Sequence, residues 1–336
     1  MSFPFETGFP ADRGVASRVR QSTALRAELE RLQTETVTGR AADPAASLGG
    51  RTAEAQRLEA ALGALEGYES AAGLMASRAS AQQDALSAVR SATQTLVDQA
   101  QSAVNSGSFT GLSVAEPAAR QALEATVSAL NARFAGRALF AGNAGDGPAL
   151  ASAADITAAA TTAIAGAPDA ATADASVRAL FDTTGGTFDT SFYVGGAGDA
   201  AAAGIAPGET ARLTLKGDDD AFRAVLREMT ALFSAVGGPG SAEEKRALVS
   251  DATNGLRTAL DDLAEAAGTL GVTEQRIEAA RTRNAAEETV LNEALTGLVG
   301  RDQFEAAGAL QATEIALETL LVTTARISNL SLTRFL

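Results

Sequence analysis

The sequence predicts a mostly α-helical protein: an elongated antiparallel bundle or coiled coil of long N- and C-terminal helices, with a small mixed α/β insert domain between them. Two patterns support this. Apolar residues recur every three or four positions over long stretches at both ends of the chain, whereas the middle is rich in Gly, Ala and acidic residues. Composition agrees, because 46% of the residues are hydrophobic but only 4% are aromatic. Ala, Leu and Val therefore supply the core, as in closely packed helices.

The N-terminal third predicts three helices. The first covers residues 15–37 and stops at Gly39, a residue that readily takes the left-handed conformation that ends helices. The second restarts after Gly49-Gly50 and continues to about residue 104. From Leu65 to Ala103 it keeps a 3,4 repeat in which ten of twelve positions are apolar. The third opens at Glu116-Pro117 and ends at Gly136, and residues 139–143 follow as a short extended piece.

The middle of the chain predicts the insert. Residues 151–175 are a low-complexity Ala-rich stretch, and we expect short strands at residues 187–194 and 211–216. A helix returns at residues 220–236 and ends at Gly237-Gly238. Residues 146–220 hold 11 acidic and 3 basic side chains, so we expect the insert to face solvent.

The C-terminal part predicts two further helices. Ser241 and Glu244 form a capping box, which starts a very long helix that runs to Gly300. The last helix begins near Arg301 and carries apolar residues on more than one side. The predicted division of the chain is therefore 1–143, 144–240 and 241–336. An isolated chain would expose the last helix, so we expect another copy or a chaperone to cover it.

Composition excludes several function classes. The chain has no His and no Cys, which removes imidazole bases, thiolate nucleophiles and the usual nitrogen and sulfur ligands of metals. The net charge of −14, without any basic run, argues against nucleic acid. No run of about 18 apolar residues is present, so we expect no membrane insertion. We find no catalytic constellation and expect no enzyme activity, cofactor or metal.

Three sequence segments resemble the bacterial flagellin family. The first is Thr38-Gly39-Arg40 followed by Asp43-Pro44, similar to the family's S/T-G-K/R and D-D-P turn, although only one Asp precedes this Pro. The second runs from Leu130-Asn131 through Gly136 to Leu139-Phe140-Ala141-Gly142. The third is the C-terminal region with Leu270-Gly271 and Ser331-Leu332. The Leu-Phe-Ala-Gly ending favours the family branch that joins hook to filament over the filament branch.

This resemblance implies a structural part of the flagellum, secreted through the flagellar type III channel and located outside the cell. It further implies a ring or helical assembly of copies, contacts with flagellin and with another hook-associated protein, and an export chaperone. The first 15 residues do not resemble the usual start of the family, which leaves the position of the export signal open.

The apolar seams supply the candidate packing residues. We expect these side chains to pack subunits or helices together, since a seam can close within one chain or between chains: Leu62, Leu65, Met75, Leu86, Val89, Leu256, Leu263, Ile277, Leu317, Leu320, Leu321 and Leu332. The family-motif residues are Thr38, Gly39, Arg40, Asp43, Pro44, Asn131, Gly136, Leu139, Phe140 and Gly142.

Other interpretations stay open. Asp218-Asp219-Asp220 fits a solvated loop and helix start better than a cation site. Thr38-Gly39-Arg40 is either a helix stop or an intersubunit contact. For the whole chain the alternatives are a filament flagellin, a soluble coiled-coil adaptor, or an enzyme that uses carboxylates alone.

Overall fold

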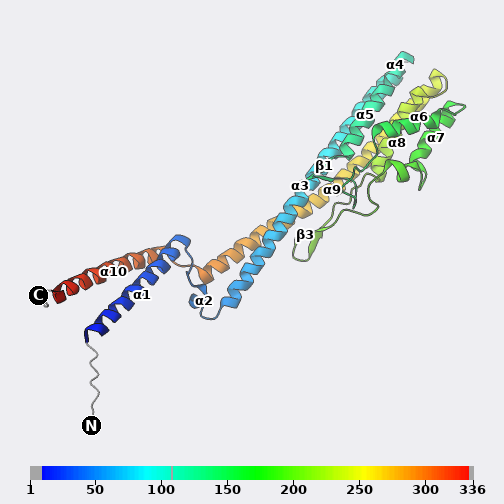
Figure 1. Cartoon of the computed structure of the whole chain (residues 1–336). Coiled ribbons are helices and arrows are strands. Elements are labelled where there is room, and N and C mark those ends of the chain that lie inside the picture. Colours follow the sequence, from blue (N-terminus) through cyan, green and yellow to red (C-terminus); the bar gives the residue numbers. More distant parts are fainter. Residues whose placement is uncertain (1–9, 107–108, 333–336) are drawn as a thin grey trace, which may run out of the picture. The chain divides into compact units, whose positions relative to one another are not determined.

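The computed structural model describes residues 10–106 and 109–332 and confirms a mostly α-helical fold with a small mixed insert. The long helices are α1 (Pro10–Thr38), α3 (Thr52–Asn105), α9 (Ala242–Val299) and α10 (Gln303–Leu332). The shorter ones are α2 (Pro44–Ser47), α4 (Phe109–Ser113), α5 (Ala115–Leu130), α6 (Ala153–Ile164), α7 (Ala170–Asp182), the π-helix η1 (Phe188–Phe192) and α8 (Asp220–Gly237). Two antiparallel hairpins, β1 (Arg133–Phe134) with β2 (Arg137–Ala138) and β3 (Ala203–Ala206) with β4 (Glu209–Ala211), complete the described elements (Figure 1).

The chain folds into two compact units. Unit 1 combines Met1–Leu65 with Ala285–Leu336, and unit 2 is Glu66–Asn284. Helices α3 and α9 each contribute residues to both units. The predicted division into domains at residues 1–143, 144–240 and 241–336 stays a prediction.

An antiparallel pair of α3 and α9 forms the spine of unit 2. Gln83 Nε2 donates to Ala267 O at 3.0 Å, Arg257 Nη2 to Gln101 Oε1 at 2.8 Å, and Arg281 Nε to Glu69 Oε1 at 2.9 Å. As the residue number rises on one helix it falls on the other, which fixes the direction of the pairing. The apolar 3,4 repeat lies in this seam, since the following residues are buried there: Ala72, Met75, Ala79, Leu86, Val89, Leu256, Leu263, Leu270 and Ile277.

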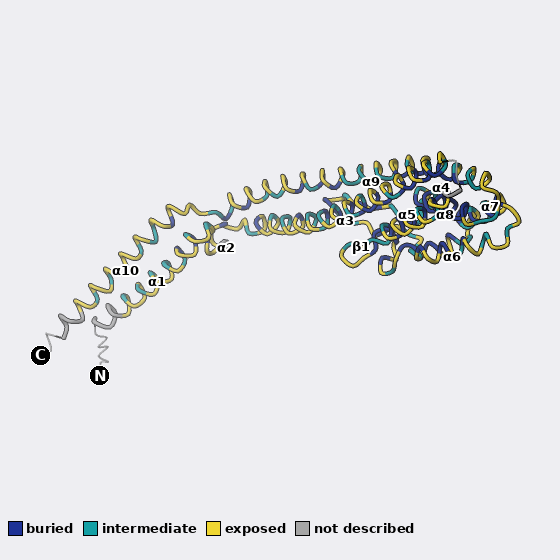
Figure 2. The backbone as a smooth tube through the Cα atoms, turned by 90° about the horizontal axis from the view of Figure 1, so that it is seen from above, coloured by how far each residue is buried: buried dark blue, intermediate teal, exposed yellow. Residues whose placement is uncertain are grey.

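Helix α8 fills the core beside α5, as its strongly apolar sequence allows. Phe222, Val225 and Met229 are fully buried, and the Phe222 ring meets Phe140 edge-on at 5.4 Å between centroids. Figure 2 shows this part of unit 2 in dark blue, the colour of buried residues. Asp219 is the N-cap residue of α8, which agrees with the helix-start interpretation of the acidic triplet. The predicted helix over residues 220–236 is confirmed.

A carboxylate is buried between α7, α8 and α9. Glu228 is only 2% exposed and accepts from Arg178 Nη1 at 2.7 Å and from Arg227 Nε at 3.0 Å. Gly255 on α9 leaves room for it, since a Cβ there would lie 2.5 Å from Glu228 Cδ. Glu228 is therefore removed from water but paired with two arginines, and removing either arginine would weaken the pairing of a buried charge.

The low-complexity stretch at residues 151–175 contains α6 and the first part of α7, two helices that were not predicted from the sequence. Ser152 and Asp155 form a capping box at the start of α6, and Asp169 caps α7 by accepting from Thr172 N at 2.8 Å. Both helices pack on α8 in unit 2. Ala-rich composition is favourable for helix, and these caps supply the start signals.

The two strands of the insert were predicted at the wrong residues. Residues 187–194 contain η1, whose Phe188 and Phe192 pack with Phe181 in an aromatic cluster, with 5.4 Å between the Phe181 and Phe192 centroids. The strands lie at Ala203–Ala206 and Glu209–Ala211 instead. Glu209 ties this hairpin to α9 through Arg276 and Arg283, and Asn284 Nδ2 donates to Ile205 O at 2.7 Å.

The third predicted helix also ends earlier than expected. Helix α5 stops at Leu130, and residues 133–138 form the β1–β2 hairpin. Asn131 causes the change: its Oδ1 accepts from Ala149 N at 2.9 Å and from Leu150 N at 2.8 Å, which draws the chain away from the helix. Ala135 and Gly136 then turn the hairpin with positive φ of 48° and 80°.

Candidate assembly surface

Unit 1 contains the antiparallel pair α1 and α10 (Figure 1). Backbone hydrogen bonds join the segment that follows α1 to the segment that precedes α10. Ala41 N donates to Val299 O at 2.9 Å, and Arg301 N donates to Gly39 O at 2.9 Å. Arg40 and Gly300 form an isolated antiparallel bridge between these bonds. The Thr38-Gly39-Arg40 segment thus pairs with the segment between α9 and α10.

The family motif at this point acts locally as a helix stop. Gly39 follows α1 with φ of 64°, and Thr38 Oγ1 donates to Thr34 O at 2.7 Å. Asp43 Oδ1 accepts from Ala46 N at 3.0 Å, which caps the short helix α2 that begins at Pro44. Pro44 suits this first helical position, because its missing N–H would have no partner there.

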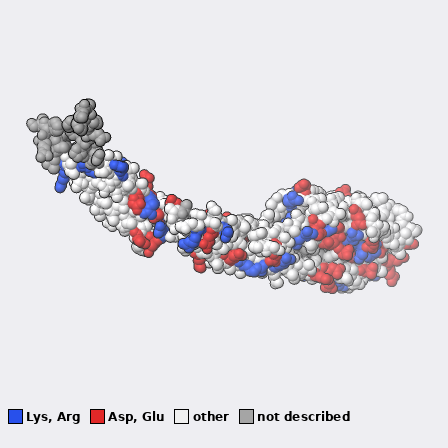
Figure 3. Space-filling view, turned by 90° about the horizontal axis from the view of Figure 1, so that it is seen from below, with Lys and Arg blue, Asp and Glu red and all other residues white. Residues whose placement is uncertain are grey.

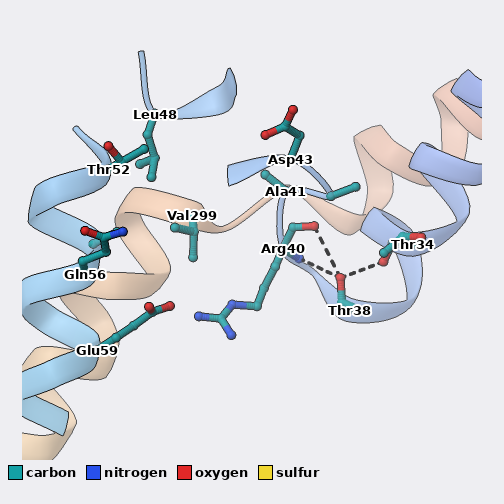
Figure 4. Close-up of a pocket in the computed structure, with 12 residues that line it drawn as sticks. Thr34, Thr38, Arg40, Ala41, Asp43, Leu48, Thr52, Gln56, Glu59 and Val299 are labelled. Carbon is teal, nitrogen blue, oxygen red and sulfur yellow. Dashed lines mark hydrogen bonds between the residues drawn. The ribbon is translucent and has the colours of Figure 1, made fainter. Parts of the chain in front are cut away.

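The same turn borders a pocket of about 540 Å³ in unit 1. Its walls come from the end of α1, the turn, the start of α3 and Val299, and Figure 4 shows the Arg40 side chain extending toward Glu59. Leu48 and Ala55 give it an apolar floor with Val299. The motif was predicted from the sequence but the pocket was not; the available signal was Gly49-Gly50, which lies just before α3.

Helix α10 exposes large apolar side chains. Phe304 is 91% exposed, Ile315 is 58% exposed and Leu321 is 48% exposed. Val322 and Ile327 are exposed as well, as are Val19 and Val37 on α1. Figure 2 shows both helices mostly in the colour of exposed residues. Exposed apolar groups concentrated on two neighbouring helices are typical of a protein–protein contact surface.

The predicted seam residues fall into two groups. The following residues are buried within one chain: Leu65, Met75, Leu86, Val89, Leu256, Leu263 and Ile277, with Leu62 half-buried against the Leu48, Ala55, Leu295 and Val299 cluster. Leu317 and Leu320 are half-buried, Leu321 is exposed, and the Leu332 side chain lies outside the described residues. The first group closes seams inside the chain. A role for any of them in packing subunits remains a prediction.

The second motif belongs to the fold of unit 2. Leu139 and Phe140 are buried, and Asn131 bonds residues 149–150 as described above. Gly142 has φ of 57°, and a Cβ there would lie 2.4 Å from Gly198 O and 2.7 Å from Gly196 O. Gly136 turns the exposed β1–β2 hairpin. Leu139 and Phe140 are therefore core residues, and Gly142 lies at a point where only glycine fits.

One arginine on α1 pairs with two carboxylates of the same helix. Arg31 bonds Glu28 and, at 2.8 Å, Glu35, and the bond from Arg31 holds the pKa of the Glu28 carboxyl below its usual range. Figure 3 shows carboxylates and cations interspersed over one face of the molecule. Among the described residues, no group of three or more His, Cys, Asp or Glu side chains is placed to hold a metal ion. None of the helices in the described part of the chain combines the length and hydrophobicity that a membrane span requires.

Both ends of the chain match models of a known protein family. Residues 15–145 match the bacterial flagellin N-terminal helical region, and residues 253–336 match the bacterial flagellin C-terminal helical region. A search of curated proteins found no match.

The fold is similar to a solved structure from Vibrio parahaemolyticus that is described as a flagellar hook-associated protein. The TM-score is 0.52 at 14% sequence identity, over 73% of this chain and 95% of that one. Flagellin-family proteins are structural and non-enzymatic, so the prediction of a protein without catalytic activity is confirmed. Together the two family regions span more than half of the chain, which belongs to the bacterial flagellin family.

Proposed function

We propose that this chain is the subunit that joins the hook to the filament, and that it does so by self-assembly through α1 and α10. A structural role in the extracellular flagellum follows from the family. The observation that carries the proposal is the set of exposed apolar side chains on α10, Phe304, Ile315, Leu321, Val322 and Ile327. Burying such groups in a contact is favourable by about 25 cal/mol per Å² of apolar surface.

Two points favour the junction over the filament. The segment Leu139-Phe140-Ala141-Gly142 is similar to the junction branch of the family. The solved structure with a similar fold is described as hook-associated. In this proposal another hook-associated protein lies on one side of the assembly and flagellin on the other. An export chaperone covers the apolar surface of α10 before secretion.

Deletion of the gene tests the proposal. Electron microscopy of the deletion strain, combined with an assay for flagellin in the spent medium, separates the two family roles. Intact hooks without filaments, with flagellin monomers in the medium, support the junction role. Absence of both filaments and released flagellin instead identifies a filament subunit, and normal filaments contradict a role in the flagellum.

A truncation tests the assigned surface in the same strain. A chain that lacks residues 319–336 should fail to restore filaments, because it loses the α10 residues Leu320, Leu321, Val322 and Ile327. Unit 2 contains none of the removed residues, so its thermal unfolding should be unchanged. Filaments restored to the wild-type number by this truncation would contradict assembly through α10.

A further inference from the structure

Three arginines of unit 2 lie close together at one hairpin, and none of them forms an ion pair within the described residues. Most arginines of this unit contact a carboxylate, as Arg120 contacts Glu116 at 3.1 Å and Arg223 contacts Asp189 at 2.7 Å. Arg78, Arg133 and Arg137 gather at the β1–β2 hairpin, and the described part of the chain gives none of them a carboxylate partner. In a chain of net charge −14, such a cluster is unexpected.

Backbone carbonyls and packing hold these side chains in place. Arg78 Nη2, from α3, donates to Ala138 O at 3.2 Å, directly after Arg137 in β2. Arg133 Nη1 donates to Asp146 O at 3.2 Å. The Arg137 guanidinium packs on Gly145, where a Cβ would lie 3.0 Å from its Nη2. Two of the three guanidinium groups are therefore oriented by main-chain oxygens, and the third by the bare backbone of a glycine.

The charge at this hairpin is unfavourable in the single chain. Arg78 is half-buried, and its burial together with the charge of Arg137 lowers the pKa of Arg78. Arg133 and Arg137 are exposed, so a partner can reach them. Guanidinium groups bind carboxylates through paired, charge-assisted hydrogen bonds, and an approaching carboxylate would offset the repulsion between Arg78 and Arg137.

A group of three exposed carboxylates on the same unit carries the opposite charge. Asp261, Asp262 and Glu265 are exposed on α9, and no ion pair involving them occurs among the described residues. The nearest arginine in sequence, Arg257, bonds Asn254 and Gln101 instead. Residues at i, i+1 and i+4 of a helix lie within about one turn, so these carboxylates form one acidic patch.

We propose that the Arg78, Arg133 and Arg137 cluster of one copy binds the Asp261, Asp262 and Glu265 patch of a second copy. This inference rests on the self-assembly of the proposed function. The two surfaces differ, so each copy offers both, and such head-to-tail contacts produce rings or helical filaments. Opposite charges at this contact fix the register between copies that otherwise repel each other.

Two charge reversals test the contact, expressed in the deletion strain. Arg137→Glu places like charges against the acidic patch, and Asp262→Arg places like charges against the arginine cluster. The measured quantity is the chain recovered in isolated flagella as a fraction of the chain exported. Each variant alone should reduce this fraction about tenfold, the effect of losing one favourable close charge pair. Arg90→Glu is the matched control, since Arg90 is an exposed α3 residue, and should behave as wild type.

Recovery of incorporation by compensating charge reversals identifies the acidic patch as the partner of the arginine cluster. The double variant R137E/D262R should recover wild-type incorporation, and so should co-expression of the two single variants, because alternating copies then present opposite charges at every contact. Incorporation of Arg137→Glu equal to that of Arg90→Glu would overturn the inference, and so would a loss that neither rescue restores. The assay measures incorporated chain in either a junction or a filament. The contact between copies can therefore still be tested if the proposed junction role is wrong.

Discussion

Helices α8 and α10 are both rich in large apolar side chains, yet they have opposite surroundings. On α8, Phe222, Val225 and Met229 are fully buried in unit 2. On α10, Phe304, Ile315 and Leu321 remain exposed in unit 1. Unit 2 therefore uses its apolar residues to close a core, whereas unit 1 keeps part of them for a surface. Apolar content alone does not tell which of the two roles a helix has.

The largest expected effect on stability comes from replacing a buried phenylalanine by alanine, compared with the same change at an exposed phenylalanine. Phe222→Ala should destabilise unit 2 by about 3–5 kcal/mol, because it opens a cavity in the core against Phe140. Phe304→Ala should change stability by less than about 0.5 kcal/mol, because that ring is exposed. Urea unfolding followed by circular dichroism measures both. Equal losses would contradict the division into a closed and an open region.

Gly39 and Gly142, two of the three motif glycines, give the next contrast. Gly142→Ala should cost at least about 3 kcal/mol, since the left-handed backbone and the clash with two carbonyl oxygens both oppose a Cβ. Gly39→Ala should cost about 1 kcal/mol, because its Cβ would meet only the flexible Gln303 side chain, 3.1 Å away. Thermal unfolding of the two variants checks the order. A larger loss for Gly39→Ala would show that the unit 1 turn is the more constrained.

A charged residue on α10 separates assembly from stability. Leu321→Asp should leave stability within about 0.5 kcal/mol of wild type, since the side chain is already exposed. Incorporation into flagella should fall, because a contact that buries Leu321 would then bury an unpaired carboxylate. Thr319→Asp adds the same charge at a neighbouring exposed position and is the control. Equal effects of the two variants would assign the loss to charge and not to the apolar surface.

The smallest effect concerns pH and the β3–β4 hairpin of unit 2. Hydrogen bonding to Arg276, with the charge of Arg283, holds the pKa of Glu209 below its ordinary 4.5. The stabilisation is therefore present above pH 4.5 and is lost as the pH falls through the lowered folded-state pKa. Glu209→Gln should lower the melting temperature slightly at neutral pH, and this difference from wild type should disappear on acidification. A difference that persists in acid would show that the ion pairs do not cause it.

Long periodic helices could be predicted from the sequence because two signals agree in them. The 3,4 repeat of α3 and α9 marks the seam, and Gly39, Gly49-Gly50 and the Ser241 capping box mark the boundaries. Each signal is local, so no tertiary information is needed. The seam residues Met75, Leu86 and Leu263 are accordingly buried.

Short elements were missed because tertiary contacts decide them. Aromatic and β-branched residues at 187–194 favour a strand, but the ring cluster of Phe181, Phe188 and Phe192 holds a π-helical turn. The arginine cluster at the β1–β2 hairpin has no periodic signal either, since Arg78 and Arg133 bond backbone carbonyls and Arg137 packs on Gly145. The repeat also cannot distinguish α8 from α10, because a seam looks the same whether the same chain or another one closes it.

The pairing of α3 with α9 has a consequence for the order of folding. Glu69 and Arg281, which bond across this pair, are 212 residues apart in the chain. Closing so large a loop is entropically costly, so contacts nearer in sequence, such as those of α6 and α7 with α8, should form first. Helix α3 alone would present an apolar seam without its partner. We therefore expect the spine of unit 2 to form last, and α3 to reach its stable state only after the rest of the unit has been made.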